Sequence, residues 1–597
     1  MKIQIIVLSL CILILSSVLT AQEMIPTPIN KKVMETPVYK KFIPSDRTVP
    51  QFTFTRTPVS LLTSYYDFMI GSYNGMPVQV IPDNVTGGGG YFLTYHGRRY
   101  ATGTRRMFYA YLDADGTVLV NNEITSVVNN EGYGTVAVDP VSGKPFYAWH
   151  CNADTDLEME VQFTVDQFYE GIYGLFLDTE TVIDNPITVS ATTDNEFIWP
   201  TAVIGPSPFP NKRRIYIIAR NSVTHTYGPS ENPIIAYADF DENQIEEGIP
   251  FTWSYTSIPE MNQWNVDVQW RRPFHSLTAD DAGNLYYAGF HFATQADGTT
   301  DIIEPDVDVF KCGDYGQGTW TRISSWGNLP SWNPNSSPSD TTGWFKNPSN
   351  QPYGDNDLTW ELFSSGSGHL NASVDDLGRI HFPAVWRIIT NDGYWFPNLQ
   401  LPKEIIFNPA QPTGSQFTIN DIWPRKNPAN TFDEHYQPWD NEPPWGEAEF
   451  IQDPNTGTWQ PRIYQSWEYP YWDQSAHDNA MFFHCNNMKV TEKNGHGMLA
   501  MVWQNCARAK WYNADGDTDY AAWANTPEIW ISVSSDNGNH WSEPIKLNNI
   551  ETPEFAGLKP MWVYPANKVK YVGMQGNQKI GKLGLMFYND YTWGAYV

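Results

Sequence analysis

Basic residues are scarce in this sequence. It carries 37 Lys and Arg against 66 Asp and Glu among its 597 residues, a formal net charge of −29. A surface this acidic repels the phosphates of nucleic acids and of anionic membranes. We therefore expect no nucleic-acid partner.

Cysteine is also scarce, with five residues in the whole chain and no C-x-x-C pair. This number excludes a fold held together by disulfides, so the core must come from hydrophobic burial. Cys485 and Cys506 lie in adjacent strand-like segments, where they could form a disulfide or remain two buried thiols.

Long hydrophobic runs are absent after the first residues. Lys2 precedes an apolar run from Ile5 to Leu19, and short residues follow up to Ala21. This pattern predicts a signal peptide over residues 1–21, with a membrane anchor as the alternative. We expect an exported mature chain, secreted, periplasmic or at the cell surface, that is not inserted in a membrane and begins with an extension over residues 22–49.

Aromatic residues, glycine and proline are plentiful. Phe, Trp and Tyr make up 15% of the chain, beside 43 Gly and 44 Pro. This composition favours strands and turns over long helices or disorder. Since a chain of this length does not build one ordinary core, we expect an all-β repeat architecture.

A hairpin pattern recurs along the chain: an apolar strand, an Asp and Gly turn, and a strand rich in aromatic residues. Clear copies have their turns at Asp139–Gly143, Asp281–Gly283 and Asp376–Gly378, and weaker copies at 208–212, 453–457 and 565–567. Intervals of about 55–95 residues suit one four-stranded blade with variable loops. The sequence predicts a single β-propeller over residues 50–597 with seven blades, six or eight being alternatives. We expect a strand from Gln51–Arg56 to close the ring.

A second recurrence falls later in each unit, where a strand precedes a turn with Asp, Gly and Trp. Its best copy is Ser534-x-Asp536-x-Gly538-x-x-Trp541, and Asp314–Trp320 and Asp113–Gly116 are similar. The segment resembles the Asp-box of sialidase-like (BNR-repeat) propellers and matches every defining position. In that family the Asp-box is structural, so the resemblance implies architecture. The early arginine motif of sialidases is not matched, since Phe42-Ile43-Pro44 lacks the arginine.

Three long insertions, at 326–366, 421–447 and 466–480, are dense in Trp, Pro, Asn and acidic residues. Exposed indole faces would suit a polysaccharide or glycan, or a cell-surface protein; the alternative is that they pack the loops onto the propeller. The ligand-binding candidates are Trp439, Trp445, Trp467 and Trp472.

Glycoside hydrolysis is the enzymatic alternative, because it needs two carboxylates that face each other across a sugar. The candidates are Glu434, Glu468 and Asp473, with solvated loop acids as the plainer interpretation. No cofactor is required by either function. Alternating oxygen ligands indicate a possible Ca²⁺ loop, or else a solvated acidic loop, at Asn513, Asp515, Asp517 and Asp519.

Arginine doublets occur at 98–99, 105–106, 213–214 and 271–272. They could gather around an acidic ligand or form surface ion pairs with the many acids. Two functions fit these observations: a propeller that binds a carbohydrate or protein partner through its loops, and a glycoside hydrolase.

Overall fold

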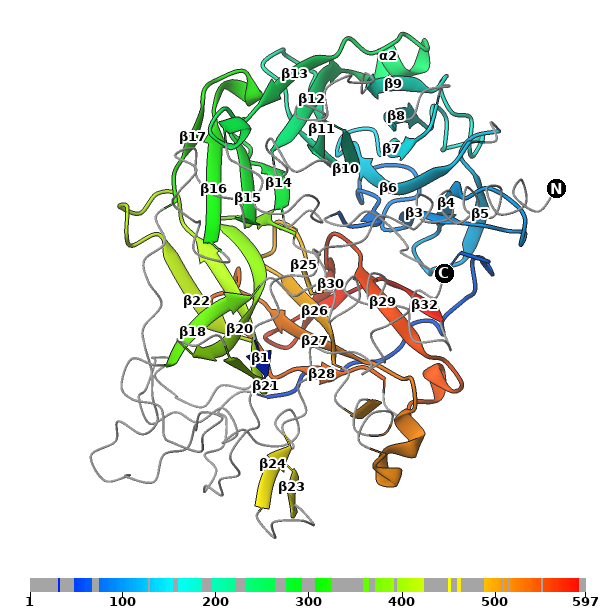
Figure 1. Ribbon diagram of the computed structural model, residues 1–597. Helices are drawn as coiled ribbons and strands as arrows, with labels where there is room; N and C mark the ends of the chain where they lie inside the picture. The colour runs from blue at the N-terminus through cyan, green and yellow to red at the C-terminus, as the bar shows by residue number, and fades with distance from the viewer. Residues whose placement is uncertain are drawn as a thin grey trace, which may run out of the picture.

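The chain forms a β-propeller, whose sheets stand in a ring in Figure 1. The computed structural model describes residues 31–32, 48–66, 75–126, 129–153, 159–184, 196–221, 232–263, 275–291, 306–324, 358–363, 371–390, 394–422, 449–452, 459–462, 488–505, 508–509, 512, 516–548 and 551–589. Over this part of the chain the all-β propeller predicted from the sequence is confirmed, and no helix is long and apolar enough to cross a membrane.

The first three blades are four-stranded antiparallel sheets, each with its strands in chain order. Blade 1 has β2 (Val78–Val80), β3 (Tyr91–Gly97), β4 (Arg106–Leu112) and β5 (Val118–Glu123); blade 2 has β6 (Glu131–Val138), β7 (Pro145–Cys151), β8 (Glu160–Val165) and β9 (Glu180–Ile183); blade 3 has β10 (Phe197–Pro206), β11 (Arg213–Asn221), β12 (Pro233–Phe240) and β13 (Ser254–Ser257).

The next three blades repeat this order. Blade 4 has β14 (His275–Ala279), β15 (Leu285–His291), β16 (Asp306–Cys312) and β17 (Trp320–Arg322); blade 5 has β19 (Ser373–Val374), β20 (Ile380–Thr390), β21 (Tyr394–Phe407) and β22 (Phe417–Asp421); blade 6 has β25 (Lys489–Val490), β26 (Leu499–Asn505), β27 (Glu528–Ser534) and β28 (Ile545–Lys546). Blade 5 is extended by β18 (Leu358–Phe363), which pairs with β20, and by β1 (Lys31–Lys32), which pairs with β21.

The strand β23 (Glu449–Gln452) pairs only with β24 (Trp459–Arg462), in a two-stranded sheet separate from the blades. Among the described residues, the strands on either side of the weaker hairpin pattern at 453–457 therefore belong to no four-stranded blade. Its turn residues themselves lie outside the described part of the chain.

The recurrent turns join the first strand of a blade to the second, or the third to the fourth. Asp139, Asp280 and Asp375 open first-to-second turns in which Gly143, Gly283 and Gly378 have φ values of 77°, 80° and 76°. The carboxylates accept hydrogen bonds from backbone N–H groups of the same turn, as in Asn284 N to Asp280 Oδ1 (2.8 Å) and Arg379 N to Asp375 Oδ1 (2.8 Å). The Asp and Gly that recur in the sequence are thus the residues that these turns require.

Because these turns alternate with the longer connections, they lie together at one end of the ring, which we call the turn end. The connections from second to third strand, and from each blade to the next, lie at the opposite loop end.

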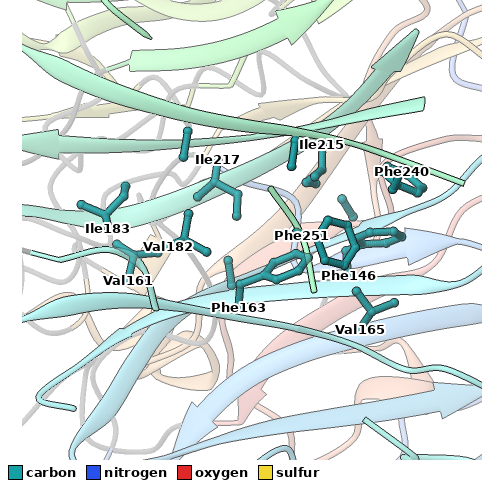
Figure 2. Close-up of a cluster of buried hydrophobic side chains, with 14 of the residues drawn as sticks. Phe146, Val161, Phe163, Val165, Val182, Ile183, Ile215, Ile217, Phe240 and Phe251 are labelled. Atoms are coloured by element: carbon teal, nitrogen blue, oxygen red, sulfur yellow. The ribbon is translucent and has the colours of Figure 1, made fainter. Parts of the chain in front are cut away.

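Neighbouring blades pack face to face through apolar side chains. Figure 2 shows the layer between blades 2 and 3, where Phe146, Phe163 and Phe251 interleave with Ile215 and Phe240. The rings of Phe146 and Phe240 are 4.6 Å apart, and those of Phe163 and Phe251 are 5.0 Å apart. Such layers stabilise a blade only against its neighbours, so the ring must close.

The ring closes through a two-stranded ribbon between blades 6 and 1. In this ribbon β29 (Pro560–Pro565) pairs with β32 (Leu585–Asn589), and β30 (Lys570–Gln575) pairs with β31 (Gln578–Lys582). The described residues therefore form six four-stranded blades and this ribbon, which takes the place of the final unit expected in the seven-blade prediction.

The closing strand expected at Gln51–Arg56 is wrong, since these residues form no strand. Phe54 is instead partly buried and packs its ring against that of Phe555, 5.9 Å away. Closure depends on Asn567. Its N–H donates to Val78 O (2.9 Å), its Oδ1 accepts from Val80 N (2.9 Å), and its Nδ2 donates to Glu492 Oε2 (3.0 Å). One side chain thus joins the ribbon to both adjacent blades.

Candidate functional site

Three first strands carry the same distortion near the loop end. Tyr133 in β6, Trp199 in β10 and Trp562 in β29 have positive φ values of 52°, 54° and 51°. Each lies in a register shift of its strand pairing. A bulky residue at positive φ is strained, and such strain is concentrated at functional sites. The repeated bulge directs attention to this end of the ring.

Each bulge is held by a side chain from the second strand of the preceding blade. Tyr133 N donates to His96 Nδ1 (2.8 Å), and Trp199 N donates to His150 Nδ1 (3.4 Å). Beside Trp562, the N–H of Val563 donates to Gln504 Oε1 (3.2 Å). The bulges are therefore a repeated structural feature of the contacts between blades.

Arg105 lies between two tyrosine rings beside the first of these bulges. Its guanidinium carbon is 5.1 Å from the ring centre of Tyr66 and 5.0 Å from that of Tyr133. Its Nη1 donates to the Tyr66 hydroxyl (3.0 Å), and its Nε donates to the carbonyl of Glu131 (2.5 Å). Two cation–π contacts fix the plane of the guanidinium, while Arg105 as a whole residue is partly exposed. We call Tyr66, His96, Arg105, Tyr133 and His150 the arginine cluster.

Arg105 forms no ion pair with a carboxylate among the described residues. Burial would lower the pKa of Arg105, but Tyr66, Tyr133 and the charge of Glu131 outweigh it and raise the pKa. The nearby Glu131 carboxylate is occupied by Arg106 Nε (3.1 Å), by Met107 N (2.9 Å) and by the Thr125 hydroxyl. A cation that is partly withdrawn from water without a counter-ion is costly, so the site favours an anion.

Both histidines of the cluster are neutral. Burial, followed by the charge of Arg105, holds the pKa values of His96 and His150 well below the ordinary value. Since Nδ1 of each ring accepts a backbone N–H, the proton lies on Nε2. Neither Nε2 has a hydrogen-bond partner among the described residues. The histidines therefore cannot repel an anion with a charge of their own.

Two tyrosine hydroxyls complete the cluster. The Tyr66 and Tyr133 oxygens are 3.4 Å apart, and the Tyr66 oxygen is the one that accepts a hydrogen bond from Arg105. Burial, followed by the nearby Tyr66, raises the pKa of Tyr133 well above its ordinary value, and it remains a phenol. The cluster can thus offer a cation, a hydroxyl pair and aromatic faces to a ligand.

The candidates that the sequence predicted in the long insertions are not placed by the structure. Trp439, Trp445, Trp467 and Trp472, as well as Glu434, Glu468 and Asp473, lie outside the described residues, as do Cys485 and Cys506. In the sequence, these tryptophans and acids lie between β22, which ends at the loop end, and β25, which begins there. Those residues therefore remain predictions.

The predicted calcium loop is described only in part. Asp517 caps the short 3₁₀ helix Thr518–Trp523, its Oδ1 accepting from Asp519 N (3.1 Å). Asn513 and Asp515 lie outside the described residues. A capping role explains one of the four candidates, and Ca²⁺ binding remains a prediction.

The arginines of the doublets differ in whether they form ion pairs. Most of their members form ion pairs, such as Arg106 with Glu131, Arg213 with Asp139 and Arg214 with Asp239. Two described members, Arg98 and Arg105, form no such ion pair, and Arg98 donates to the carbonyl of Tyr65 (2.7 Å). Positions 271–272 lie outside the described residues. The sequence pointed to the doublet at 105–106 but not to the two tyrosines and two histidines of the cluster. The histidines share a pattern that could have identified them, an aromatic residue followed by His at the end of a second strand, in Tyr95-His96 and Trp149-His150.

The Asp-box lies at the turn end, between the third and fourth strands of blade 6, as its pattern predicted. Ser534 Oγ accepts from Gly538 N (2.9 Å) and donates to Asp536 Oδ1 (2.9 Å), and Asp536 Oδ1 also accepts from His540 N (3.0 Å). Trp541 is buried, and its Nε1 donates to Glu404 Oε2 (2.5 Å) in blade 5.

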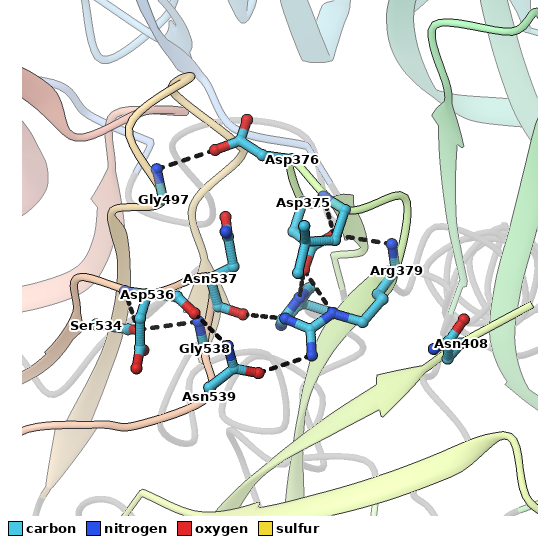
Figure 3. Close-up of polar contacts among 12 residues, drawn as sticks. Asp375, Asp376, Arg379, Asn408, Gly497, Ser534, Asp536, Asn537, Gly538 and Asn539 are labelled. Atoms are coloured by element: carbon cyan, nitrogen blue, oxygen red, sulfur yellow. Dashed lines mark hydrogen bonds and ion pairs between the residues drawn. The ribbon is translucent and has the colours of Figure 1, made fainter. Parts of the chain in front are cut away.

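A buried network joins this turn to blade 5 (Figure 3). Arg379 binds Asp375 Oδ2 (2.8 Å), the carbonyl of Asn537 (2.6 Å) and Asn539 Oδ1 (2.9 Å). Behind it, the fully buried ring of His381 bridges Asp375 Oδ2 (2.9 Å) and Glu404 Oε1 (2.5 Å). The Asp-box therefore acts here as part of a contact between blades.

Ser534→Ala is expected to lower the free energy of unfolding by about 1–3 kcal/mol, because the buried N–H of Gly538 would lose its acceptor. Asp536→Ala should cost less, since the Asp536 side chain is partly exposed. Urea denaturation of both variants, with the exposed Ser535→Ala as the matched control, measures the difference. An equal cost for Asp536→Ala and Ser534→Ala would contradict this assignment.

Comparison with known proteins adds no family. No family model and no curated protein matches the chain. Among solved structures it is similar to a Hadza microbial sialidase (TM-score 0.25, 11% identity, 54% of this chain and 57% of that chain). It is also similar to a GH62 hydrolase in complex with xylotriose (0.26, 9%, 55% and 91%) and to a Bombyx mori GH32 beta-fructofuranosidase (0.27, 11%, 60% and 65%). At these scores we take nothing about function from them, and the propeller fold is established by the sheets described above.

Proposed function

We propose that the protein binds a polysaccharide bearing carboxylate groups, at the arginine cluster. The observation that carries this proposal is Arg105, whose guanidinium is held between two rings and forms no ion pair with a carboxylate among the described residues. A carboxylate would provide the missing charge through charge-assisted hydrogen bonds.

A sugar acid suits this site better than a small inorganic anion. Tyr66 and Tyr133 place aromatic faces beside the guanidinium, and aromatic faces pack against the apolar side of sugar rings. The predicted Trp-rich insertions connect strand ends at the same loop end, where further sugar units of a chain would contact them. The predicted signal peptide would bring the protein to the compartment where such polysaccharides occur.

Glycoside hydrolysis, the alternative, has less support. It needs two free carboxylates, and within the described residues the acid beside Arg105 is Glu131, which already has three partners. Hydrolysis would depend on Glu434, Glu468 and Asp473, which the structure does not describe.

The test compares polysaccharides that differ only in charge. Polygalacturonate and alginate, each in native and carboxyl-reduced form, are titrated into the full chain by isothermal titration calorimetry. We expect at least one native polymer to bind and its reduced form to bind at least about tenfold more weakly, the loss of one charge-assisted contact. Equal affinity for both forms, or no binding of either acid, would overturn the proposal.

A further inference from the structure

We infer that the hydroxyl pair of Tyr66 and Tyr133 cleaves a bound uronate chain by β-elimination, with Arg105 holding the uronate carboxylate. This inference depends on the proposed binding function and adds a reaction to it. The three side chains come from the segment before blade 1, the β3–β4 connection and the first strand of blade 2, and they meet at the loop end.

The chemistry begins with the carboxylate. In a uronate, C5 carries both a hydrogen and the carboxylate, and C4 carries the glycosidic oxygen O4. A guanidinium on the carboxylate stabilises the negative charge that develops there when the C5 proton leaves. Arg105 is oriented for this by both rings and by its bond to the Tyr66 hydroxyl.

The hydroxyl spacing fits the two proton transfers. The departing C5 hydrogen and O4 are on adjacent carbons, so a base and an acid must stand within a few ångströms of each other. The two tyrosine oxygens are 3.4 Å apart. A general acid and a general base each need hydrogen-bond reach of the atom they serve.

The reaction balances without water or a redox partner. The Tyr66 phenolate takes the C5 proton, and the C5–H electron pair becomes the C4=C5 double bond. The C4–O4 bond breaks, and O4 leaves with its electron pair and receives the proton of Tyr133. The products are a chain ending in an unsaturated uronate and a chain with a free 4-hydroxyl. The proton on Tyr66 then passes to Tyr133 across the pair, which restores the starting state.

The environment assigns the two roles. Tyr66 is partly exposed and its hydroxyl oxygen accepts a hydrogen bond from Arg105 Nη1 (3.0 Å), so we assign it the role of the base. Tyr133 is buried, and burial raises its pKa, so it remains the proton donor. The neutral His96 holds the backbone of Tyr133 in its strained conformation, which fixes the position of that hydroxyl.

The experiment follows the conjugated double bond by ultraviolet absorbance, using whichever native polymer binds in the titration above. The wild-type chain should generate absorbance. Tyr66→Phe and Tyr133→Phe should each lower the rate by about 100-fold or more while leaving the dissociation constant within about threefold. The matched control is Tyr65→Phe, since Tyr65 is 59% exposed and its hydrogen bonds with Arg98 use its backbone N–H and carbonyl.

The outcomes separate the two proposals. Binding of a native acid without any ultraviolet product would overturn the elimination and leave the binding function standing. New reducing ends without absorbance would also overturn it, by showing hydrolysis. If neither acid binds, the proposed function fails and the elimination fails with it. Circular dichroism and thermal unfolding of both Phe variants confirm that they are folded; a folded variant with an unchanged rate would exclude that hydroxyl.

Discussion

His381→Ala is expected to lower the free energy of unfolding by about 3–5 kcal/mol, the largest effect on stability that we foresee. The substitution would leave the carboxylates of Asp375 and Glu404 buried and facing each other without the cation between them. It would also disturb the contact of the Asp-box with blade 5, since Trp541 donates to the same Glu404. Urea denaturation of the full chain measures the loss.

The pH dependence identifies the cause. Burial alone would lower the pKa of His381, but Glu404 and Asp375 outweigh it and raise the pKa to about 9. A raised pKa in the folded state stabilises the protein fully below about pH 6.5, and this contribution is lost as the pH rises through about 9. For Asp375, His381 and Arg379 outweigh burial and lower the pKa, so its contribution is lost only in acid.

The wild type should therefore lose stability between about pH 6.5 and 9, and His381→Ala should not show this loss. His540→Ala is the matched control, because His540 also pairs with a carboxylate, that of Asp536, but its side chain is 88% exposed. If the variant and the wild type have the same pH profile, His381 is not the cation of this network.

Arg105→Met is expected to weaken binding of the native acidic polysaccharide by about 10- to 100-fold, the largest functional effect after the tyrosine substitutions. Methionine keeps much of the length and the apolar contact with both rings but removes the charge. Arg105→Lys should recover only part of the affinity, because an ammonium lacks the planar fork that stacks and binds a carboxylate in two places. Calorimetry with native and reduced polymer gives both constants.

The control is Arg99→Met, at the same end of blade 1, where the arginine already pairs with Glu123 at 3.4 Å. Its affinity should stay close to that of the wild type. If Arg105→Met and Arg99→Met lower the affinity equally, the effect arises from the general charge of this end and not from the arginine cluster.

The fold was accessible from the sequence because its signals are local. An Asp that accepts N–H groups within its own turn and a Gly at positive φ recur wherever a hairpin must form, as at Asp280–Gly283. The Asp-box was placed correctly for the same reason, since Ser534 to Trp541 form one turn. Ring closure was not accessible, because Asn567 joins residues nearly 500 positions apart in the sequence.

The arginine cluster shows the same limit. Tyr66 and Tyr133 are 67 positions apart, and only the folded chain shows that both rings enclose Arg105. The doublet at 105–106 could not reveal which arginine would form no ion pair. That depends on Glu131, which turns its side chain to Arg106 and offers only its carbonyl to Arg105. Composition and local sequence pattern do not show which arginine the Glu131 side chain pairs with.

The closure at Asn567 gives the ring a joint that differs from its other joints. Since the ribbon of β29 and β32 is the thinnest sheet around the ring among the described residues, this joint should open at a lower free energy than the full unfolding of the blades, and its amides should exchange earliest with solvent. The same ribbon reaches the arginine cluster, where the Tyr588 hydroxyl donates to the carbonyl of Tyr66 (3.4 Å). A polymer bound at Tyr66 would thus slow amide hydrogen exchange in the ribbon. Binding at the site would therefore be detected as an increase in the free energy needed to open the ring.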